Sequence, residues 1–447
     1  MKKNYLFKLL LSVALLIGGC GCVMAQDGKA KAEELFRFLM DGKGDSVHVR
    51  LTEDIRSKIA PAVFSETPKQ LEAQFGSFQS KGPWGTSTNG DMTVYYCDVR
   101  FERSALRFFT VFNKDGRVNT VRFVPATPAA KSTTDNLLNN DKMAESSFEL
   151  ISGKYKLPAV LTLPKAGKKV PVVILVHGSG PNDRDESIGP NKPFRELAHE
   201  LALRGVAVLR YDKRTLVYPS SWESVAGKGT FMDETVEDAL AAIDWVRGHA
   251  SVDSTKVYIL GHSLGATLAP LIAQQAHNRL AGVIMLSAAA RPMEDLIWEQ
   301  VTYLSTLPGN NQYGADKLQQ LKKQVDNVKV AGTRKFNVEL GGPMNASESY
   351  WVFAHNYNPL KTVAKLRLRM LLLQGERDYQ VTMNDFSLWK SALQKRRNVF
   401  LKSYPELNHL YQRGVGKSTP GEYMKSDSIP AYVMNDVACW VVTGLLK

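Results

Sequence analysis

The sequence predicts an α/β fold in which helices cover both faces of a mostly parallel sheet, preceded by a smaller α+β domain. From about residue 148 onward, short apolar runs of strand length alternate with amphipathic helical runs, the pattern of a parallel sheet buried on both sides. Residues 27–125 instead place one helical run before several alternating, strand-like runs. The chain has 447 residues, which suits two or three domains.

A basic and then apolar segment opens the chain. Three lysines lie near the start: Lys2, Lys3 and Lys8. The apolar run that follows, residues 9–17, is too short for a stable membrane anchor. We therefore expect residues 1–25 to be a signal segment that exports the protein from a bacterial cytoplasm.

Two processing sites compete within this segment. Small residues at Val23 and Ala25 favour cleavage before Gln26, whereas the sequence IGGC resembles a lipobox and favours a lipid on Cys20. Either route places the mature protein in the periplasm, or at the outer membrane or cell surface as a lipoprotein. Membrane attachment is expected only through a lipidated Cys20.

The composition is that of a globular protein, with 44% hydrophobic and 23% charged residues. The net charge of +13 is spread along the chain without a long basic block, so we interpret it as a solvated surface. No nucleic-acid partner is expected, because the protein is exported and carries no binding motif. Only four cysteines occur, and no C-x-x-C or histidine cluster indicates a metal.

The first domain is predicted over residues 27–125 as a small α+β unit of unknown function. It opens with a helix at 32–42. Three alternating runs then read as antiparallel strands: 92–102, 106–113 and 116–126. A stretch rich in Thr, Pro, Ala and Ser follows, and residues 126–146 are predicted to be a linker.

The second domain is predicted over residues 147–447. Residues 147–164 give two opening strands with a hairpin, and helical runs lie at 194–205 and 233–249. Further strand-like runs follow one another along the chain: 170–178, 206–212, 257–263, 281–289, 368–378 and 399–409. The alternation indicates a mostly parallel sheet covered by helices.

An insertion at about 291–365 interrupts this alternation and is predicted to be a cap over the carboxyl edge of the sheet. It contains the aromatic residues Tyr350, Trp351 and Phe353, which we expect to wall a substrate pocket. Two other interpretations stay open: the aromatics form the core of the cap itself, or the insertion is surface decoration remote from the site.

The stretch VYILGHSLGATLAP carries the first chemical signal. Gly261 and Gly265 flank Ser263 in a G-x-S-x-G pattern between a strand-like and a helix-like run. In a nucleophile elbow, the serine stands on a strained strand-to-helix turn, and the glycines avoid clashes there. An ordinary βα turn containing serine is the alternative, and it is tested by whether the chain supplies a base, an acid and an oxyanion hole.

A serine nucleophile needs a base, which a carboxylate orients. Three histidines follow Ser263. His277 lies near the end of the helix after the elbow, and His355 lies in the insertion. His409 lies in a loop after a strand, where it can reach over the sheet edge, and is the predicted base.

The acid is expected at a strand end between the serine and the histidine. The buried run LRMLLLQGERD ends with Glu376 and Asp378. Asp378 lies just past the strand and is the predicted acid, with Glu376 as the alternative.

An oxyanion hole needs two backbone N–H groups aimed at the developing charge. Leu264 supplies one at the start of the helix after the nucleophile. The loop HGSGPNDRDE supplies the other, through Ser179 or, as the next choice, Gly180. His177 is interpreted as a brace of this loop. We expect the charged residues Asp183, Arg184 and Asp185 to lock it through internal ion pairs.

The segments HGSGPNDRDESIGPNKPF, VLRYDKRT and GHSLGATLAP resemble a bacterial serine-esterase subgroup, and residues 148–447 look like the α/β-hydrolase superfamily, in its esterase and dienelactone-hydrolase-like group. In that subgroup the hydrolase commonly follows a small α+β domain of unknown function. The resemblance implies an α/β-hydrolase fold that hydrolyses short-chain acyl esters without a metal or organic cofactor. Dienelactone hydrolases proper use a cysteine nucleophile, which argues against that activity because Ser263 stands here.

The leading hypothesis is an exported serine carboxylesterase acting through a Ser-His-Asp acyl-enzyme mechanism on a small-molecule or glycan-borne ester. A serine peptidase of the prolyl-oligopeptidase type is the alternative, although those enzymes usually carry a large β-propeller in front. A third hypothesis, a binding protein without activity, conflicts with the complete catalytic set. The sequence leaves open the natural substrate, the role of the first domain and the oligomeric state.

Overall fold

The computed structural model describes residues 25–57, 59–89, 92–102, 105–125, 137–165, 169–218, 229–308 and 313–446. The chain divides into two compact units, Met1–Thr133 and Thr134–Lys447. The signal segment and the Cys20 site predicted above therefore lie outside the described residues, apart from Ala25, at which the first helix begins. No helix of the described residues combines the length and the apolar character that crossing a bilayer requires.

The first unit packs helices on one antiparallel sheet. Its helices are α1 (Ala25–Met40), α2 (Gly44–His48), α3 (Glu53–Arg56) and α4 (Pro61–Phe75). Its strands are β1 (Phe78–Lys81), β2 (Gly85–Asn89), β3 (Met92–Phe101), β4 (Ala105–Phe112) and β5 (Val118–Pro125). The order is β1-β3-β4-β5, with β2 also paired to β3. Cys97 and Phe108 face each other across β3 and β4 in a core that includes Leu35 and Phe64, because alternate residues of a strand share one face.

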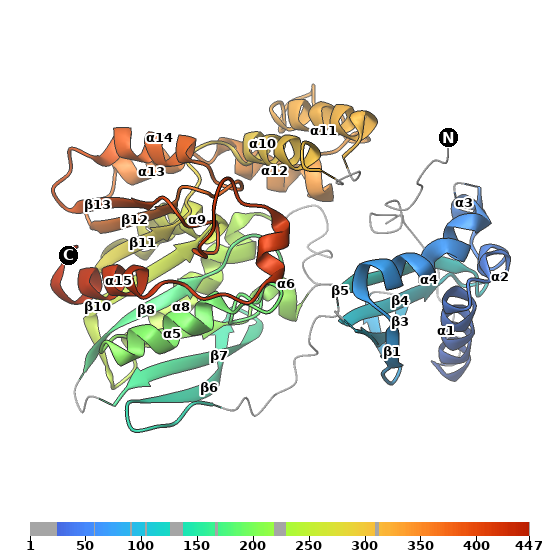
Figure 1. Cartoon of the computed structure of the whole chain (residues 1–447), viewed down its shortest axis with the longest axis horizontal. Coiled ribbons are helices and arrows are strands. Elements are labelled where there is room, and N and C mark those ends of the chain that lie inside the picture. Colours follow the sequence, from blue (N-terminus) through green and yellow to red (C-terminus); the bar gives the residue numbers. More distant parts are fainter. Residues whose placement is uncertain are drawn as a thin grey trace. The chain divides into compact units, whose positions relative to one another are not determined.

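The second unit is built on an eight-stranded sheet (Figure 1). Its strands are β6 (Met143–Ser152), β7 (Tyr155–Pro164), β8 (Val170–Val176), β9 (Ala207–Tyr211), β10 (Val252–His262), β11 (Gly282–Leu286), β12 (Arg369–Gly375) and β13 (Val399–Tyr404). The spatial order is β13-β12-β11-β10-β8-β9-β7-β6. Pairing is antiparallel for β6 with β7 and for β7 with β9, and parallel from β9 through β8 to β13. This is the mostly parallel sheet that the alternation of apolar runs predicted.

Helices cover both faces of this sheet. One face packs against α5 (Pro193–Leu203) and α15 (Ala431–Thr443), and the other against α8 (Glu237–Arg247), α9 (Leu264–Ala276), α13 (Pro359–Ala364) and α14 (Met383–Leu393). Strand β8 shows the division, because Val173 and Leu175 join the α5 side whereas Val172 and Ile174 join the α8 side. Apolar residues therefore run continuously along the strand.

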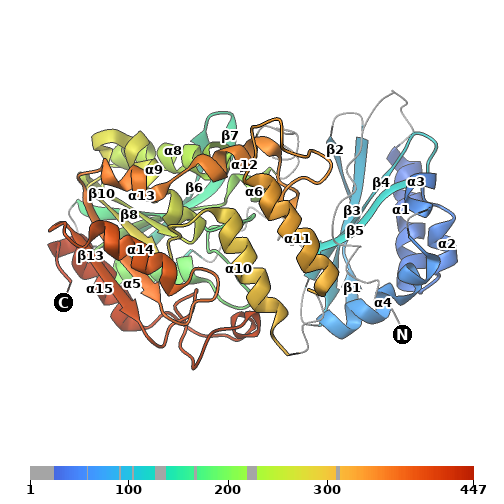
Figure 2. The same ribbon diagram turned by 90° about the horizontal axis from the view of Figure 1, so that it is seen from above.

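The insertion lies between β11 and β12. It contains α10 (Met293–Ser305), α11 (Ala315–Val328), the short turn η4 (Pro343–Asn345), α12 (Glu348–Asn356) and α13. Figure 2 shows α10 and α11 side by side. The term cap is used below for α10, α11 and α12.

Two boundaries differ from the prediction. Strand β6 begins at Met143, so the first strand of the sheet starts inside the residues 126–146 that were predicted to be a linker. Glu145, Ser146 and Ser147 near the start of β6 are polar and give no apolar run. Strand β6 nevertheless pairs with β7 from Met143↔Pro164 onward. Likewise, β10 begins at Val252, five residues before the apolar run that predicted it.

Candidate active site

Ser263 stands on a strained turn between β10 and α9. Its backbone has φ 54° and ψ −115°, a conformation that a residue with a side chain rarely adopts. A Cβ on Gly261 would overlap the Gly265 carbonyl, and one on Gly265 would overlap the carbonyl of Val176. The two glycines are therefore required by the turn, and Ser263 is held where its N–H donates to the Leu286 carbonyl at 3.0 Å.

Asp378 and His409 meet beyond the ends of two neighbouring strands, β12 and β13. His409 Nδ1 lies 2.6 Å from Asp378 Oδ2, and both side chains are almost fully buried. The other oxygen of Asp378 accepts the N–H groups of Gln380 and Val381. His409 lines the same cavity as Ser263, so the structure brings the three predicted residues to one place.

The alternatives considered from the sequence lie elsewhere. Glu376 is exposed and accepts a hydrogen bond from the Ser403 hydroxyl. His277 is at the far end of the 13-residue helix α9, about 20 Å along the axis from Ser263. His355 is paired with the buried Glu294 in the cap.

The predicted oxyanion donors Ser179 and Leu264 also line the cavity of Ser263. Leu264 opens α9, where the first N–H groups of a helix have no partner within it. Gly178 packs so closely that a Cβ there would lie 3.2 Å from Ser263 Cβ. Ser179 follows directly, so its peptide bond lies next to the nucleophile.

A buried carboxylate holds the loop of Gly178 in place. Glu186 Oε1 accepts the Gly178 N–H at 2.7 Å, and its Oε2 lies 2.9 Å from His262 Nδ1. His262 Nε2 lies 3.0 Å from the His409 carbonyl. Glu186 and His262 thus link the loop after β8 to the loop that carries His409.

The pKa values of these buried groups follow from their neighbours. Burial alone would lower the pKa of His262, but the Glu186 carboxylate outweighs it and raises that pKa above its ordinary value. Burial would raise the pKa of Glu186, but the charge of His262 lowers it. Burial lowers the pKa of His177 to about 4. His177 is therefore neutral, packed between the rings of Phe194 and Tyr211.

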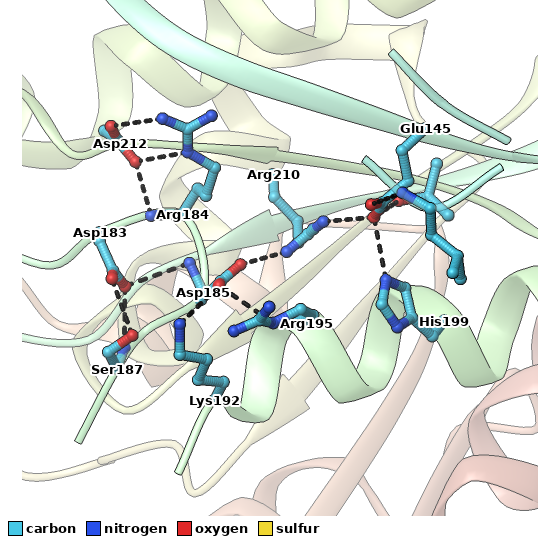
Figure 3. A network of polar contacts seen from close by, with 12 residues as sticks. Glu145, Asp183, Arg184, Asp185, Ser187, Lys192, Arg195, His199, Arg210 and Asp212 are labelled. Atoms are coloured by element: carbon cyan, nitrogen blue, oxygen red, sulfur yellow. Dashed lines mark hydrogen bonds and ion pairs between the residues drawn. The ribbon is translucent and has the colours of Figure 1, made fainter. Parts of the chain in front are cut away.

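The charged residues of the loop after β8 are held mainly by partners outside the loop (Figure 3). Arg184 donates from Nε and Nη2 to Asp212 after β9, at 3.0 and 3.1 Å. Asp185 pairs with Arg210 of β9 and with Arg195 of α5. The predicted locking of the loop is thus achieved largely by ion pairs to neighbouring elements rather than by internal ones.

The cavity beside Ser263 has a volume of about 230 Å³. Apolar residues line much of it: Phe231, and from the cap and its flanks Met293, Leu296, Ile297, Ala354, Tyr357 and Pro359. Arg291 also lines it, but its guanidinium is held by Asp385 and Glu299. The cavity is therefore suited to an apolar group of limited size.

The pocket wall predicted from Tyr350, Trp351 and Phe353 needs correction. All three belong to α12, but none is among the described residues that line the cavity. Tyr350 and Trp351 are buried in the core of the second unit, and Phe353 packs against that core. These aromatics belong to a core that the cap shares with the rest of the second unit, whereas apolar residues of α10 line the cavity.

Reasoning from the sequence missed the polar residues behind the site, namely Glu186, His262, Lys213 and Glu234. Lys213 Nζ donates to the Gly178 carbonyl at 2.8 Å and to Glu234 Oε1 at 2.6 Å. The run RYDKRT holds four charged residues at the end of a buried strand, the first of them, Arg210, still inside it. That pattern was the available signal, because charges at the end of a buried strand need partners.

The strand order, the serine elbow and the cap define a serine hydrolase with an α/β-hydrolase fold. A family model described as X-Pro dipeptidyl-peptidase (S15 family) matches residues 152–405, more than half of the chain. The chain belongs to this family, within the α/β-hydrolase superfamily. A second model, for a protein family of unknown function (DUF3887), matches residues 32–120.

Among characterised proteins, the chain is similar to Esterase EstD of Thermotoga maritima. The identity is 33% over 415 residues, which is 92% of this chain and 95% of that protein. Similar solved structures include Est1E from Butyrivibrio proteoclasticus, with 17% identity, a TM-score of 0.41, and coverage of 59% of this chain and 90% of that one. The esterase domain of a Rhodothermus marinus protein has 17% identity and a TM-score of 0.39, covering 67% of this chain and 97% of that one.

Proposed function

We propose that this serine hydrolase is an exported carboxylesterase that cleaves short-chain acyl esters through an acyl-enzyme on Ser263. The observation that carries the proposal is the pairing of His409 with Asp378 at 2.6 Å beside the same cavity that Ser263 lines. The similarity to an esterase over nearly the whole chain supports the ester as substrate. The small apolar cavity supports a short acyl group.

The proposed reaction has two halves. Ser263 Oγ attacks the ester carbonyl carbon while His409 Nε2 takes its proton, and Asp378 holds the imidazole through Nδ1. The carbonyl oxygen becomes an oxyanion that accepts hydrogen bonds from the N–H groups of Ser179 and Leu264. His409 gives its proton to the leaving alcohol, and the acyl-enzyme forms. Water then repeats the sequence, with His409 as its base, and releases the acid.

A peptidase is the second candidate, because the family model that matches is described as an X-Pro dipeptidyl-peptidase. An enzyme that removes dipeptides must recognise a free α-ammonium group, for which an available carboxylate is the natural partner. Glu186 is the one acidic residue among the described residues lining the cavity. Its two oxygens already face the Gly178 N–H and His262, which favours the ester.

Two assays test the proposal: the first tests for an active serine nucleophile, and the second separates the ester from the peptide as substrate. A fluorophosphonate probe should label the wild-type protein and leave Ser263→Ala unlabelled. Purified protein should hydrolyse p-nitrophenyl acetate and butyrate far faster than Ala-Pro-p-nitroanilide. Faster cleavage of the anilide would establish the peptidase instead, and absence of both labelling and hydrolysis would leave a protein without activity.

Export is also part of the proposal. It rests on the basic and apolar segment at 1–25, with cleavage after Ala25 and lipidation of Cys20 as the two routes. Mass spectrometry of the mature N-terminus in cell fractions distinguishes them. A mature chain that begins at Met1 in the cytoplasm would contradict export.

A further inference from the structure

A lysine is buried behind the oxyanion loop, where lysines rarely lie. Lys213 directly precedes α6 (Arg214–Val217), and the residue is only 2% exposed. Its Nζ donates to Gly178 O at 2.8 Å and to Glu234 Oε1 at 2.6 Å. Burying a charge is costly unless it is paired and hydrogen-bonded, and one of its two partners here is the backbone next to the nucleophile.

The geometry of the peptide bond links this contact to the site. The carbonyl of Gly178 and the N–H of Ser179 belong to one planar trans unit and point in opposite directions. A cation that fixes the carbonyl on one side therefore fixes the direction of the N–H on the other. Ser179 lines the cavity with Ser263, and in the described parts of the chain its N–H donates to no acceptor.

Other contacts hold the same peptide from behind. The Asn182 side-chain amide donates to the carbonyls of Gly178 and Ser179 at 3.2 and 3.1 Å. The N–H of Lys213 in turn donates to the Asn182 carbonyl at 3.0 Å. The carbonyl oxygens of the loop are thus engaged on the side of Lys213, which leaves the Ser179 N–H for the cavity.

We propose that Lys213 is a positioning residue that orients and polarises the Gly178–Ser179 peptide for the oxyanion. The inference rests on the proposed esterase reaction, in which the Ser179 N–H meets the developing charge. A cation at the carbonyl strengthens the dipole of the whole amide, because hydrogen bonds in series polarise one another. Lys213 exchanges no proton in the reaction.

A chain of buried contacts holds Lys213 and reaches the cap. Tyr350 of α12 donates from its hydroxyl to Glu234 Oε2 at 2.9 Å. Burial and the nearby Glu234 carboxylate raise the pKa of Tyr350 well above its ordinary value, so the hydroxyl keeps its proton and donates. Glu234 lies in a single π-helical segment, η2 (Met232–Val236), a type of turn found frequently at functional sites. The buried Lys213–Glu234 ion pair therefore contacts the oxyanion loop through Gly178 and the cap through Tyr350.

The role predicts a separation between binding and turnover. Lys213 acts on a bond that strengthens only when Ser263 Oγ has added to the carbonyl carbon and charge has moved to the oxygen. Loss of Lys213 should therefore lower kcat and leave KM nearly unchanged. Loss of Lys213 should also weaken the binding of an alkyl trifluoromethyl ketone inhibitor by the same factor. Addition of Ser263 to that ketone produces an oxyanion at the same place.

The test uses paired substitutions so that no buried charge is left alone. Replacing both members of a buried ion pair by neutral residues is often tolerated, whereas removing one is destabilising. The test variant is Lys213→Met with Glu234→Gln in the full-length protein. The matched control is Arg214→Met with Asp238→Asn, since Arg214 forms a similarly buried pair at 2.5 Å. Lys213→Arg keeps a cation and serves as the conservative variant.

Removing a whole oxyanion donor costs about 10²–10³ in kcat, so a misdirected donor should cost roughly 10–10². We expect this fall in kcat, and an equal rise in the inhibition constant of the ketone, in the test variant. We expect neither in the control, and a partial recovery in Lys213→Arg.

Three results would overturn the proposal: kcat of the test variant within about threefold of wild type, an equal fall in the control, or a fall in kcat without weaker ketone binding. The ketone is assayed by its binding, independently of turnover. Tight ketone binding by a wild-type protein that hydrolyses no ester would therefore contradict the proposed substrate and leave the positioning role standing.

Discussion

At the scale of single residues, two carboxylates that lie two positions apart in the chain differ in their burial and in their partners. Asp378 is 2% exposed and its Oδ2 faces His409 Nδ1. Glu376 points to solvent and bonds the hydroxyl of Ser403. The sequence placed both at a strand end, and only the packing of the loops shows which one meets the histidine.

Asp378→Asn should reduce kcat by roughly four orders of magnitude, because an amide cannot hold the imidazole in the tautomer that accepts the serine proton. The fold should persist, since Asn keeps an oxygen for the N–H groups of Gln380 and Val381. Steady-state hydrolysis of p-nitrophenyl acetate, with circular dichroism as the check on folding, measures this.

Glu376→Gln is the matched control and should retain nearly full activity. Equal losses in the two variants, with both folded, would show that the acid is misassigned.

At the scale of elements, the loop after β8 is fastened to its neighbours by the charged network of Figure 3. Glu145 of β6 accepts hydrogen bonds from Arg210 at 2.6 Å and lies 3.0 Å from His199 Nε2. Arg210 also reaches Asp185 in the loop. Burial alone would raise the pKa of Glu145, but these two partners outweigh it and lower the pKa from 4.5 to about 2.

This pKa sets a pH dependence of stability. A carboxylate whose pKa is lowered by folding contributes stability above its unfolded-state pKa of 4.5, and that contribution is lost as the pH falls through the folded-state value. We expect Glu145→Gln to lower the free energy of unfolding by about 2–3 kcal/mol at pH 7. The difference from wild type should shrink as the pH falls from 4.5 to about 2.

Urea unfolding at a series of pH values measures this difference. Glu149 is an exposed residue of the same strand and pairs only with the exposed Lys156 among described residues. Glu149→Gln should therefore change stability by less than about 1 kcal/mol. A stability difference for Glu145→Gln that does not vary between pH 7 and pH 2 would contradict the assigned cause.

Two apolar residues of the cap, Ile297 and Trp351, should differ in their effect on substrate preference, because only Ile297 lines the cavity. Ile297 of α10 lines the cavity, so Ile297→Ala should shift the preference toward longer acyl chains. Each added methylene that is buried contributes about 0.8 kcal/mol, or about fourfold in kcat/KM. A chain-length series of p-nitrophenyl esters measures the shift.

Trp351 is fully buried in the core and provides the contrast. Trp351→Ala should cost about 3–5 kcal/mol of stability and leave the chain-length profile unchanged. If Trp351→Ala shifted the profile and Ile297→Ala did not, the pocket wall would be the one first predicted from the aromatics.

The elements themselves were largely predictable. Buried parallel strands read as continuous apolar runs, so β8, β9, β11 and β12 stand out in the sequence. The first residues of β6 do not, because that edge strand has one neighbour and carries polar side chains such as Glu145. Periodicity identifies the helices of the cap but does not show which of their faces meets the cavity.

At the scale of the whole molecule, the two units have separate cores. Phe108 is fully buried in the first unit and packs against the rings of Phe36, Trp84 and Phe123. Ser263, Asp378 and His409 all belong to the second unit. Stability of the first core and chemistry of the site should therefore vary independently.

Phe108→Ala should lower the melting temperature of one calorimetric transition, through a loss of about 3–5 kcal/mol, with kcat for p-nitrophenyl acetate unchanged. Scanning calorimetry and kinetics on the same preparation measure both. A parallel fall of kcat at a temperature where the second unit is folded would show that the first unit supports catalysis.

The candidate catalytic residues could be predicted from the sequence, but the buried polar residues that hold the site in place could not. Ser263, Asp378 and His409 follow the ends of β10, β12 and β13, and their order along the chain with strand ends between them is visible in the sequence. The contacts of Lys213 with Gly178 and Glu234 join segments that are 35 and 21 residues apart in the chain. No spacing rule predicts such contacts, because they depend on how the loops pack.

We expect an acyl group to reside on Ser263 during turnover. Rapid acid quenching during hydrolysis of a p-nitrophenyl ester whose acyl group leaves slowly, such as the pivalate, followed by peptide mass spectrometry, tests it directly. We predict the acyl mass on the peptide that contains Ser263, at a level equal to the burst of p-nitrophenol, and no such mass in Ser263→Ala. An acyl group on another residue, or unchanged hydrolysis by Ser263→Ala, would contradict it.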